Sequence, residues 1–232
     1  MATIEINITR FDKSDNNQVE YGFEESHINN PIPVLLKFAE NPDLFRQKNG
    51  KYRIVMTENQ NQKILEYLKK KDFHQESFGN PQDAQYLLAF SFGEKTDVNA
   101  ELATITERIG KNVPFVDIAV QWEIADLLST REPAFIQRVH RIDLDYGKDY
   151  ITTDGVIDKF IKEIIPIHET NEMPRMFIVA QAWHAPRCIA KCNAKGLNVV
   201  GGDFSERFSP YDPQEWVRNA FSWVLKEGTT RT

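Results

Sequence analysis

One stretch of this chain combines residue types that can bind or transform a ligand. Residues 176–202 begin with an apolar run and then place Gln181, Trp183, His184 and Arg187 just before a segment of helical character. Open α/β sheets bind their ligands at the carboxyl ends of parallel strands. The spacing therefore predicts a ligand site that contains the His184 imidazole and the Arg187 guanidinium.

The chemistry of this site depends on the helix that is predicted to begin at Pro186. The positive end of a helix dipole disfavours an imidazolium, so we expect a lowered pKa for His184 and a neutral ring that acts as a base or a hydrogen-bond partner. The backbone N–H groups of Ala185 and Arg187, with the Arg187 guanidinium, would bind a phosphate or carboxylate. The structural alternative is that Trp183 packs, His184 caps the helix and Arg187 pairs with a surface acid.

Residues after the other predicted strands can share this edge. Gly93 follows an apolar run and would let the backbone approach a phosphate, although a single glycine is a weak signal. Glu123 follows the next strand and is a candidate acid beside a His184 base. Thr152, Thr153 and Asp154 either cap a helix or line the same pocket. The catalytic candidates are thus His184 and Glu123, and the other residues are candidates for ligand binding.

Composition and motifs exclude several classes of function. A net charge of -6 gives no electrostatic footprint for nucleic acid. The chain has neither a run of about eighteen apolar residues nor a signal-peptide core at its start, so we expect a cytoplasmic protein without a membrane span. Cys188 and Cys192 lack a second ligand pair, so no metal site is predicted. GxSxG, Walker A and GxGxxG patterns are absent, which disfavours classical serine hydrolases, ATPases and dinucleotide dehydrogenases.

The elements that would position these residues alternate between strand and helix. Short apolar runs separated by amphipathic segments are typical of a parallel sheet with helices on both faces. We therefore expect an α/β, Rossmann-like, three-layer fold. The predicted strands cover residues 86–92, 115–120, 139–144, 176–180 and 197–200. The predicted helices cover residues 99–109, 123–128, 156–165, 186–194 and 213–226.

The beginning of the chain predicts a separate extension. Residues 2–11 and 18–23 alternate between polar and apolar types around a polar turn, which indicates a β-hairpin. A short helix at 34–39 then precedes a β-α unit, with a strand at 52–57 and a helix at 58–71. The expected domains are an N-terminal β-hairpin/α extension, 1–80, and the Rossmann-like domain, 81–232.

The segment AWHAPR, residues 182–187, resembles a motif of a known family. Its order of aromatic residue, His, Pro and Arg at the end of a strand is similar to that in the YdcF/SanA-like domain family, whose function is unknown. Residues 196–199 resemble the start of that family's next strand, and the resemblance covers about residues 86–200. It implies a Rossmann-like fold and an S-adenosylmethionine or nucleotide-type ligand. The chain has fewer glycines at the strand ends than is usual in that family.

Three functions stay open from the sequence. The first is binding of an anionic or nucleotide-like small molecule at the carboxyl edge of the sheet. The second is a catalytically silent interaction or scaffold protein that uses its N-terminal extension, since an exposed strand edge can pair with a partner or with a second copy in a homo-oligomer. The third is a hydrolase with His184 as its base. The sequence does not decide whether the protein is an enzyme.

Overall fold

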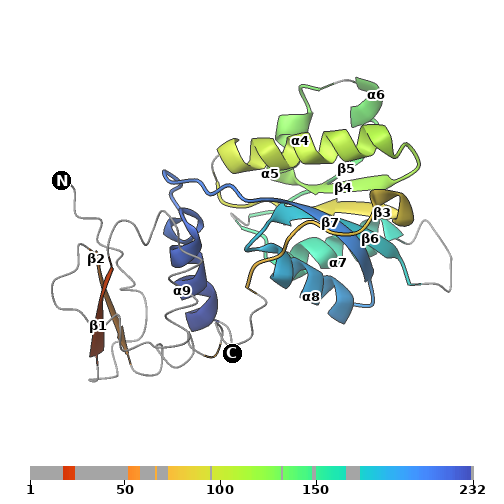
Figure 1. Cartoon of the computed structure of the whole chain (residues 1–232). Coiled ribbons are helices and arrows are strands. Elements are labelled where there is room, and N and C mark those ends of the chain that lie inside the picture. Colours follow the sequence, from red (N-terminus) through yellow and green to blue (C-terminus); the bar gives the residue numbers. More distant parts are fainter. Residues whose placement is uncertain are drawn as a thin grey trace. The chain divides into compact units, whose positions relative to one another are not determined.

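The computed structural model describes residues 18–23, 52–57, 66, 73–94, 96–131, 133–147, 150–165 and 173–230. The chain forms two compact units (Figure 1). The larger unit is His74–Pro213, and the other combines Met1–Phe73 with Gln214–Thr232. All candidate site residues lie in the larger unit. The last helix of the chain belongs to the unit that contains the N-terminal residues. The sequence predicts it as part of the domain 81–232.

The larger unit is built on a five-stranded parallel sheet with the strand order β5-β4-β3-β6-β7. The chain moves outward from β3 to β5 and then returns to the other side of β3, so the strand order reverses between β3 and β6. This arrangement confirms the predicted α/β, Rossmann-like fold. The strands are β3 (Tyr86–Ala89), β4 (Asp117–Gln121), β5 (Val139–Ile142), β6 (Arg175–Gln181) and β7 (Asn198–Ser205).

Helices cover both faces of this sheet (Figure 1). The helices α4 and α5 lie on one face, and α7 and α8 lie on the other. Because both faces are covered, the central strands are apolar on both sides between their end residues, as in other buried parallel sheets. The helical segments of this unit are η2 (Pro81–Asp83), α4 (Thr96–Asn112), α5 (Trp122–Leu128), α6 (Pro133–Ile136), α7 (Thr153–Glu163) and α8 (Ala185–Ala194).

The ends of α7 and α8 follow from local side-chain chemistry. The N-cap of α7 is Thr152, whose hydroxyl oxygen accepts a hydrogen bond from the Gly155 N–H at 3.1 Å. Of the three predicted capping residues, Thr152 is thus confirmed as the cap, whereas Thr153 and Asp154 lie within the helix. The helix α8 has Pro in its first turn and is followed by Gly196 with φ +81, which confirms its predicted start and stop.

The described residues of the smaller unit form two strands and a terminal helical segment. Strand β1 (Gln18–Phe23) pairs antiparallel with β2 (Tyr52–Thr57), which confirms both strands. The predicted strand 2–11, with its hairpin pairing, and the predicted helix 34–39 lie outside the described residues, as does 58–71 apart from the helical residue Glu66. The C-terminal elements are η4 (Glu215–Val217) and α9 (Ala220–Thr230).

Two differences from the predicted elements affect the edge of the sheet. The first strand ends at Ala89 rather than at residue 92. The last strand continues to Ser205 rather than ending at residue 200. None of the described helices is both long and apolar enough to cross a bilayer.

Candidate functional site

The turn after β6 forms the centre of the candidate site. The side-chain Oε1 of Gln181 accepts hydrogen bonds from the backbone N–H groups of Trp183, at 2.7 Å, and His184, at 3.2 Å. An amide NH2 group in that place would face two donors, so these contacts fix the orientation of the Gln181 amide. Gln181 thus holds the chain at the start of α8 from inside the protein.

The His184 ring lies inside the protein rather than in solvent. Only 6% of the residue is exposed, and its ring centroid lies 6.2 Å from that of Phe90 and 6.0 Å from that of Phe92. Its Nε2 lies 3.3 Å from the hydroxyl oxygen of Thr153 on α7. His184 occupies the N-cap position of α8, as the structural alternative expects, but its side chain makes no capping hydrogen bond to the helix. The fold does bring two predicted site residues, His184 and Thr153, into contact.

Part of the backbone that the sequence assigns to an anion site at the start of α8 is already hydrogen-bonded within the protein. The N–H group of Arg187 donates to the carbonyl of His184 at 3.1 Å. The two N–H groups before α8 donate to Gln181. The expectation that the Arg187 N–H is available to a ligand is therefore wrong. The half-buried Arg187 side chain, in the first turn of α8, is the cationic group that the site retains.

A second polar cluster joins the ends of β3 and β4. The backbone N–H of Ser91 donates to Gln121 Oε1 at 3.2 Å, and Gln121 Nε2 lies 3.4 Å from Glu123 Oε1. Burial raises the pKa of the Glu123 carboxyl, and hydrogen bonds from its own backbone and from the Ser91 and Gln121 side chains offset only part of this effect. A carboxyl of this kind stays protonated to higher pH than an exposed one, as a general acid requires.

We expect Glu123→Gln to raise the stability of the protein at pH 8 and to change it little at pH 5. Because the pKa of Glu123 is raised above 4.5 in the folded state, the wild-type protein loses stability as the pH rises through that raised value. The glutamine variant does not lose stability in this way. Urea unfolding at pH 5 and pH 8 measures the free energy of unfolding of both proteins, and Glu163→Gln, at an exposed position, is the control for loss of one charge. Equal effects of Glu123→Gln at the two pH values would contradict the assignment.

The loop after β3 is held by side chains that the sequence did not single out. Asn99 Oδ1 accepts from the N–H of Phe92 at 2.9 Å, and Asn99 Nδ2 donates to the carbonyl of Gly93 at 3.2 Å. Asp212 Oδ2 accepts from the N–H of Glu94 at 2.9 Å. Gly93 itself has φ +75, a conformation that glycine adopts without steric cost. The turn at Gly93 is thus present, and its contact with a ligand stays a prediction.

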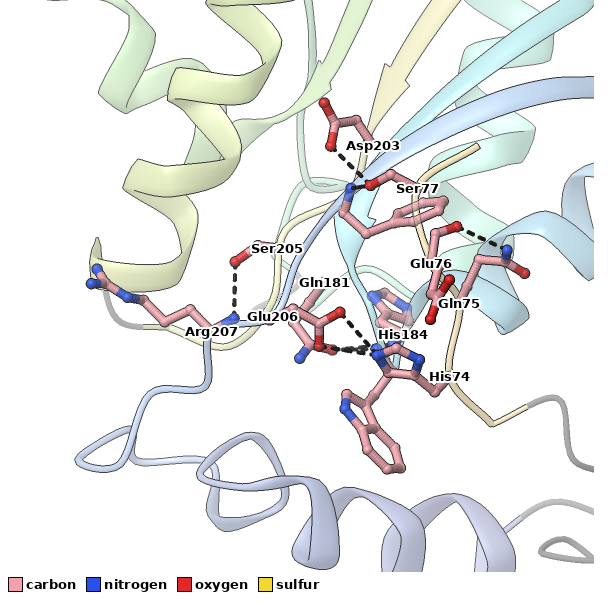
Figure 2. A network of polar contacts seen from close by, with 12 residues as sticks. His74, Gln75, Glu76, Ser77, Gln181, His184, Asp203, Ser205, Glu206 and Arg207 are labelled. Atoms are coloured by element: carbon pink, nitrogen blue, oxygen red, sulfur yellow. Dashed lines mark hydrogen bonds and ion pairs between the residues drawn. The ribbon is translucent and has the colours of Figure 1, made fainter. Parts of the chain in front are cut away.

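A segment that precedes the sheet crosses the turn after β6. In this segment, 74–79, which we call the strap, the N–H of Gln75 donates to the carbonyl of Ala182 at 3.0 Å. Figure 2 shows His74 Nε2 beside the Glu206 carboxylate, 3.0 Å from each oxygen. The His74 ring also lies edge-on to Trp183, with 5.3 Å between the ring centroids. Trp183 is buried under this contact, so its packing role is confirmed.

The strap also covers the outer edge of β7. Phe78 and Gly202 exchange both backbone hydrogen bonds, at 3.0 and 2.9 Å. The Ser77 hydroxyl donates to Asp203 Oδ1 at 3.0 Å and accepts from the N–H of Phe204 at 3.0 Å (Figure 2). These bonds satisfy backbone groups that an edge strand would otherwise present to other chains.

Asp154 connects two helices of the same face. Its carboxylate pairs with Lys191 of α8, and one turn later Asp158 pairs with Lys195. These ion pairs tie α7 to α8, and the two helices carry Thr153 and His184 at their starts. Asp154 thus has a structural partner, and its contact with a ligand stays a prediction.

The two cysteines are structural residues. Cys188 and Cys192 are fully buried on α8, and neither forms a disulfide bond. Burial raises the pKa of Cys192 to about 12, which keeps this thiol protonated and unreactive. Among the described residues, His, Cys, Asp and Glu side chains form no group of three or more that could hold a metal ion.

Buried polar side chains of the larger unit gather at the carboxyl edge of the sheet. In the described part of the unit, every buried polar side chain except that of Thr106 belongs to the last residue of a strand or to the turn or helix start that follows. Burial of polar groups costs free energy unless they are hydrogen-bonded, and such groups concentrate at functional sites. These residues are Ser91, Asn99, Gln121, Thr153, Gln181, His184, Ser205, Ser209 and Asp212.

Comparisons with known proteins add no relative to this picture. No protein-family model matches the chain, and neither a curated protein nor a solved structure was found to match it. The resemblance of residues 86–200 to the YdcF/SanA-like family therefore stays a prediction.

Proposed function

We propose that this protein binds an anionic or nucleotide-like small molecule at the carboxyl edge of its parallel sheet. The observation that carries the proposal is the concentration of buried polar side chains at that edge, in a core that is otherwise apolar. A site for a small polar molecule needs a few fixed hydrogen-bonding groups within an apolar surround. The edge of this sheet supplies both.

The strand order also supports a binding site at the carboxyl edge of the sheet. The strand order reverses between β3 and β6, and open α/β sheets bind ligands outside the strand ends at such a point. Gly93 and the loop held by Asn99 lie on the β3 side of this point. Gln181 and His184 lie on the β6 side.

The charge of the ligand is inferred from Arg187. It lies in the first turn of α8, where the helix dipole also favours a negative group. A guanidinium can bind a phosphate or a carboxylate through two parallel hydrogen bonds. The family resemblance favours a ligand of the same type, and the scaffold and hydrolase alternatives stay predictions.

Calorimetric titration with AMP, S-adenosylmethionine and glucose 6-phosphate tests the proposal. We expect at least one of these to bind the wild-type protein and Arg187→Ala to weaken its binding at least about tenfold, which corresponds to about 1.4 kcal/mol. The matched control is Lys195→Ala, which removes one positive charge at the other end of the same helix. Equal affinities in wild type and Arg187→Ala would remove Arg187 from the site. Absence of binding by all three compounds would contradict the proposed function.

A further inference from the structure

The amide nitrogen of Gln181 is a buried donor whose purpose the fold does not explain. Gln181 is fully buried, and its Nε2 has no hydrogen-bond partner among the described residues. The amide cannot turn over to relieve this, because Oε1 is held by the N–H groups of Trp183 and His184. An unmet buried donor costs about 1–3 kcal/mol. A cost of this size at the switch point of the sheet indicates a group that a ligand satisfies.

The strand order brings Gln181 and the second polar cluster to the same edge of the sheet. Strand β3 lies between β4 and β6, Gln181 is the last residue of β6, and Ser91 lies in the turn that follows β3. Ser91 bonds to Gln121, the last residue of β4. Neighbouring strands lie about 4.8 Å apart, so the row from β6 across β3 to β4 spans about 10 Å. That is the length of a small polar molecule rather than of a single ion.

Other unmet groups lie at the β4 end of this row. Glu123 Oε2 and Trp122 Nε1 are buried and have no hydrogen-bond partner among the described residues. With Gln181 Nε2 at the β6 end, the row offers donors at both ends and a carboxyl oxygen at one of them. A phosphate offers only acceptors and would be repelled by Glu123 whenever its carboxyl is ionised. A neutral group with both donors and acceptors fits the row better.

We propose that Gln181 Nε2 donates a hydrogen bond to the ligand, and that the ligand presents a neutral polar edge, such as a heterocycle or a carboxamide, to the row from Gln181 to Glu123. This inference rests on the proposed function and names the part of the ligand that enters the β3–β6 switch point. The N–H groups of Trp183 and His184, just before α8, do not bind a phosphate, because Gln181 Oε1 already accepts from both. A negative group of the same ligand lies toward Arg187.

Binding of adenosine, uridine and inorganic phosphate to the wild-type protein and to Gln181→Glu tests the inference. Glutamate retains an acceptor for the N–H groups of Trp183 and His184 but lacks the amide donor. We expect a nucleoside to bind the wild type, at least tenfold weaker binding to Gln181→Glu, and no binding of phosphate alone at the same concentrations. Because a buried carboxylate at this position can prevent folding, the side-chain NH2 resonances of Gln181 in 15N spectra of the wild type provide a second measurement. They are expected to shift when the nucleoside is added.

The outcomes separate this inference from the proposed function. Equal nucleoside affinity in a folded Gln181→Glu variant, or unmoved Gln181 NH2 resonances in the nucleoside complex, would overturn the inference alone. Binding of phosphate without binding of either nucleoside would also overturn it, while leaving an anion site at this edge. Failure of both nucleosides, phosphate, AMP, S-adenosylmethionine and glucose 6-phosphate to bind would overturn the inference together with the proposed function.

Discussion

Asn99→Ala is expected to lower the free energy of unfolding by about 2–4 kcal/mol, because it leaves two backbone groups of the buried loop after β3 without partners. Asn99 is 1% exposed, accepts from the N–H of Phe92 and donates to the carbonyl of Gly93. Water cannot easily replace these bonds at a buried position. Urea unfolding measures the loss, and hydrogen exchange at Phe92 reports release of the loop.

Two further variants separate the hydrogen bonds from the helix. Asn99→Asp retains the acceptor for the Phe92 N–H but sets a buried carboxylate oxygen against the Gly93 carbonyl, so we expect a loss at pH 7 at least as large as that of Asn99→Ala, and a smaller loss at low pH, where the protonated carboxyl donates again. Asn112→Ala removes an exposed asparagine from the last position of the same helix and should change stability by less than about 0.5 kcal/mol. If Asn99→Ala were as mild as Asn112→Ala, the loop would not depend on Asn99.

The sequence predicts the sheet because its strands are apolar on both faces. Runs such as YLLA in β3 and FIVA in β6 have no polar face, and this pattern is typical of buried parallel strands. The apolar pattern does not show where a strand stops. Phe90 and Phe92 are as buried as β3 itself, yet they belong to the turn that packs on His184. Burial alone does not distinguish a buried strand from a buried turn.

The predicted end of the last strand, β7, also differs from the structure. The predicted strand 197–200 stops before Gly201 and Gly202, whereas β7 continues through both glycines, although glycine is rare inside strands. Here the missing side chains make room for neighbouring rings: a Cβ on Gly201 would lie 2.7 Å from Phe177, and one on Gly202 would lie 2.3 Å from Phe204. The space that a ring needs is set by tertiary packing, which local sequence does not show.

The candidate site was predicted where a polar side chain directly follows an apolar strand. Gln181, His184 and Glu123 satisfy that rule, and the fold places all three at the carboxyl edge. Asp212 could not be found in this way, because its bond to the Glu94 N–H joins residues 118 apart in the chain. Such a contact exists only once the sheet is formed.

The two adjacent threonines before α7 show a limit of cap prediction. Both residue types suit an N-cap, but only the Thr152 hydroxyl reaches the N–H of Gly155. The next side chain, Thr153, turns inward to the His184 ring. A shift of one residue along the helix start thus exchanges a capping residue for a site residue, and the sequence contains no signal that distinguishes them.

Gly79→Ala is expected to lower the free energy of unfolding by about 3 kcal/mol and to detach the strap from β7. Gly79 has φ +72, and a Cβ there would lie 2.3 Å from the carbonyl oxygen of Val200 and 2.7 Å from the Cα of Gly201. Both atoms belong to the backbone of β7, so no side-chain rotation relieves the clash. Because Phe78 and Gly202 exchange hydrogen bonds beside this contact, their amides should exchange with solvent faster in the variant.

Gly147→Ala provides the matched control for the clash. Gly147 has φ +75, nearly the same as Gly79, but a Cβ there would meet no atom within 4 Å. Alanine at this position therefore has only the cost of a left-handed backbone, about 1 kcal/mol. The difference between the two variants in urea unfolding isolates the contact of the strap with β7. If the two variants lost equal stability, close packing of the strap would contribute nothing beyond the conformation of a single glycine.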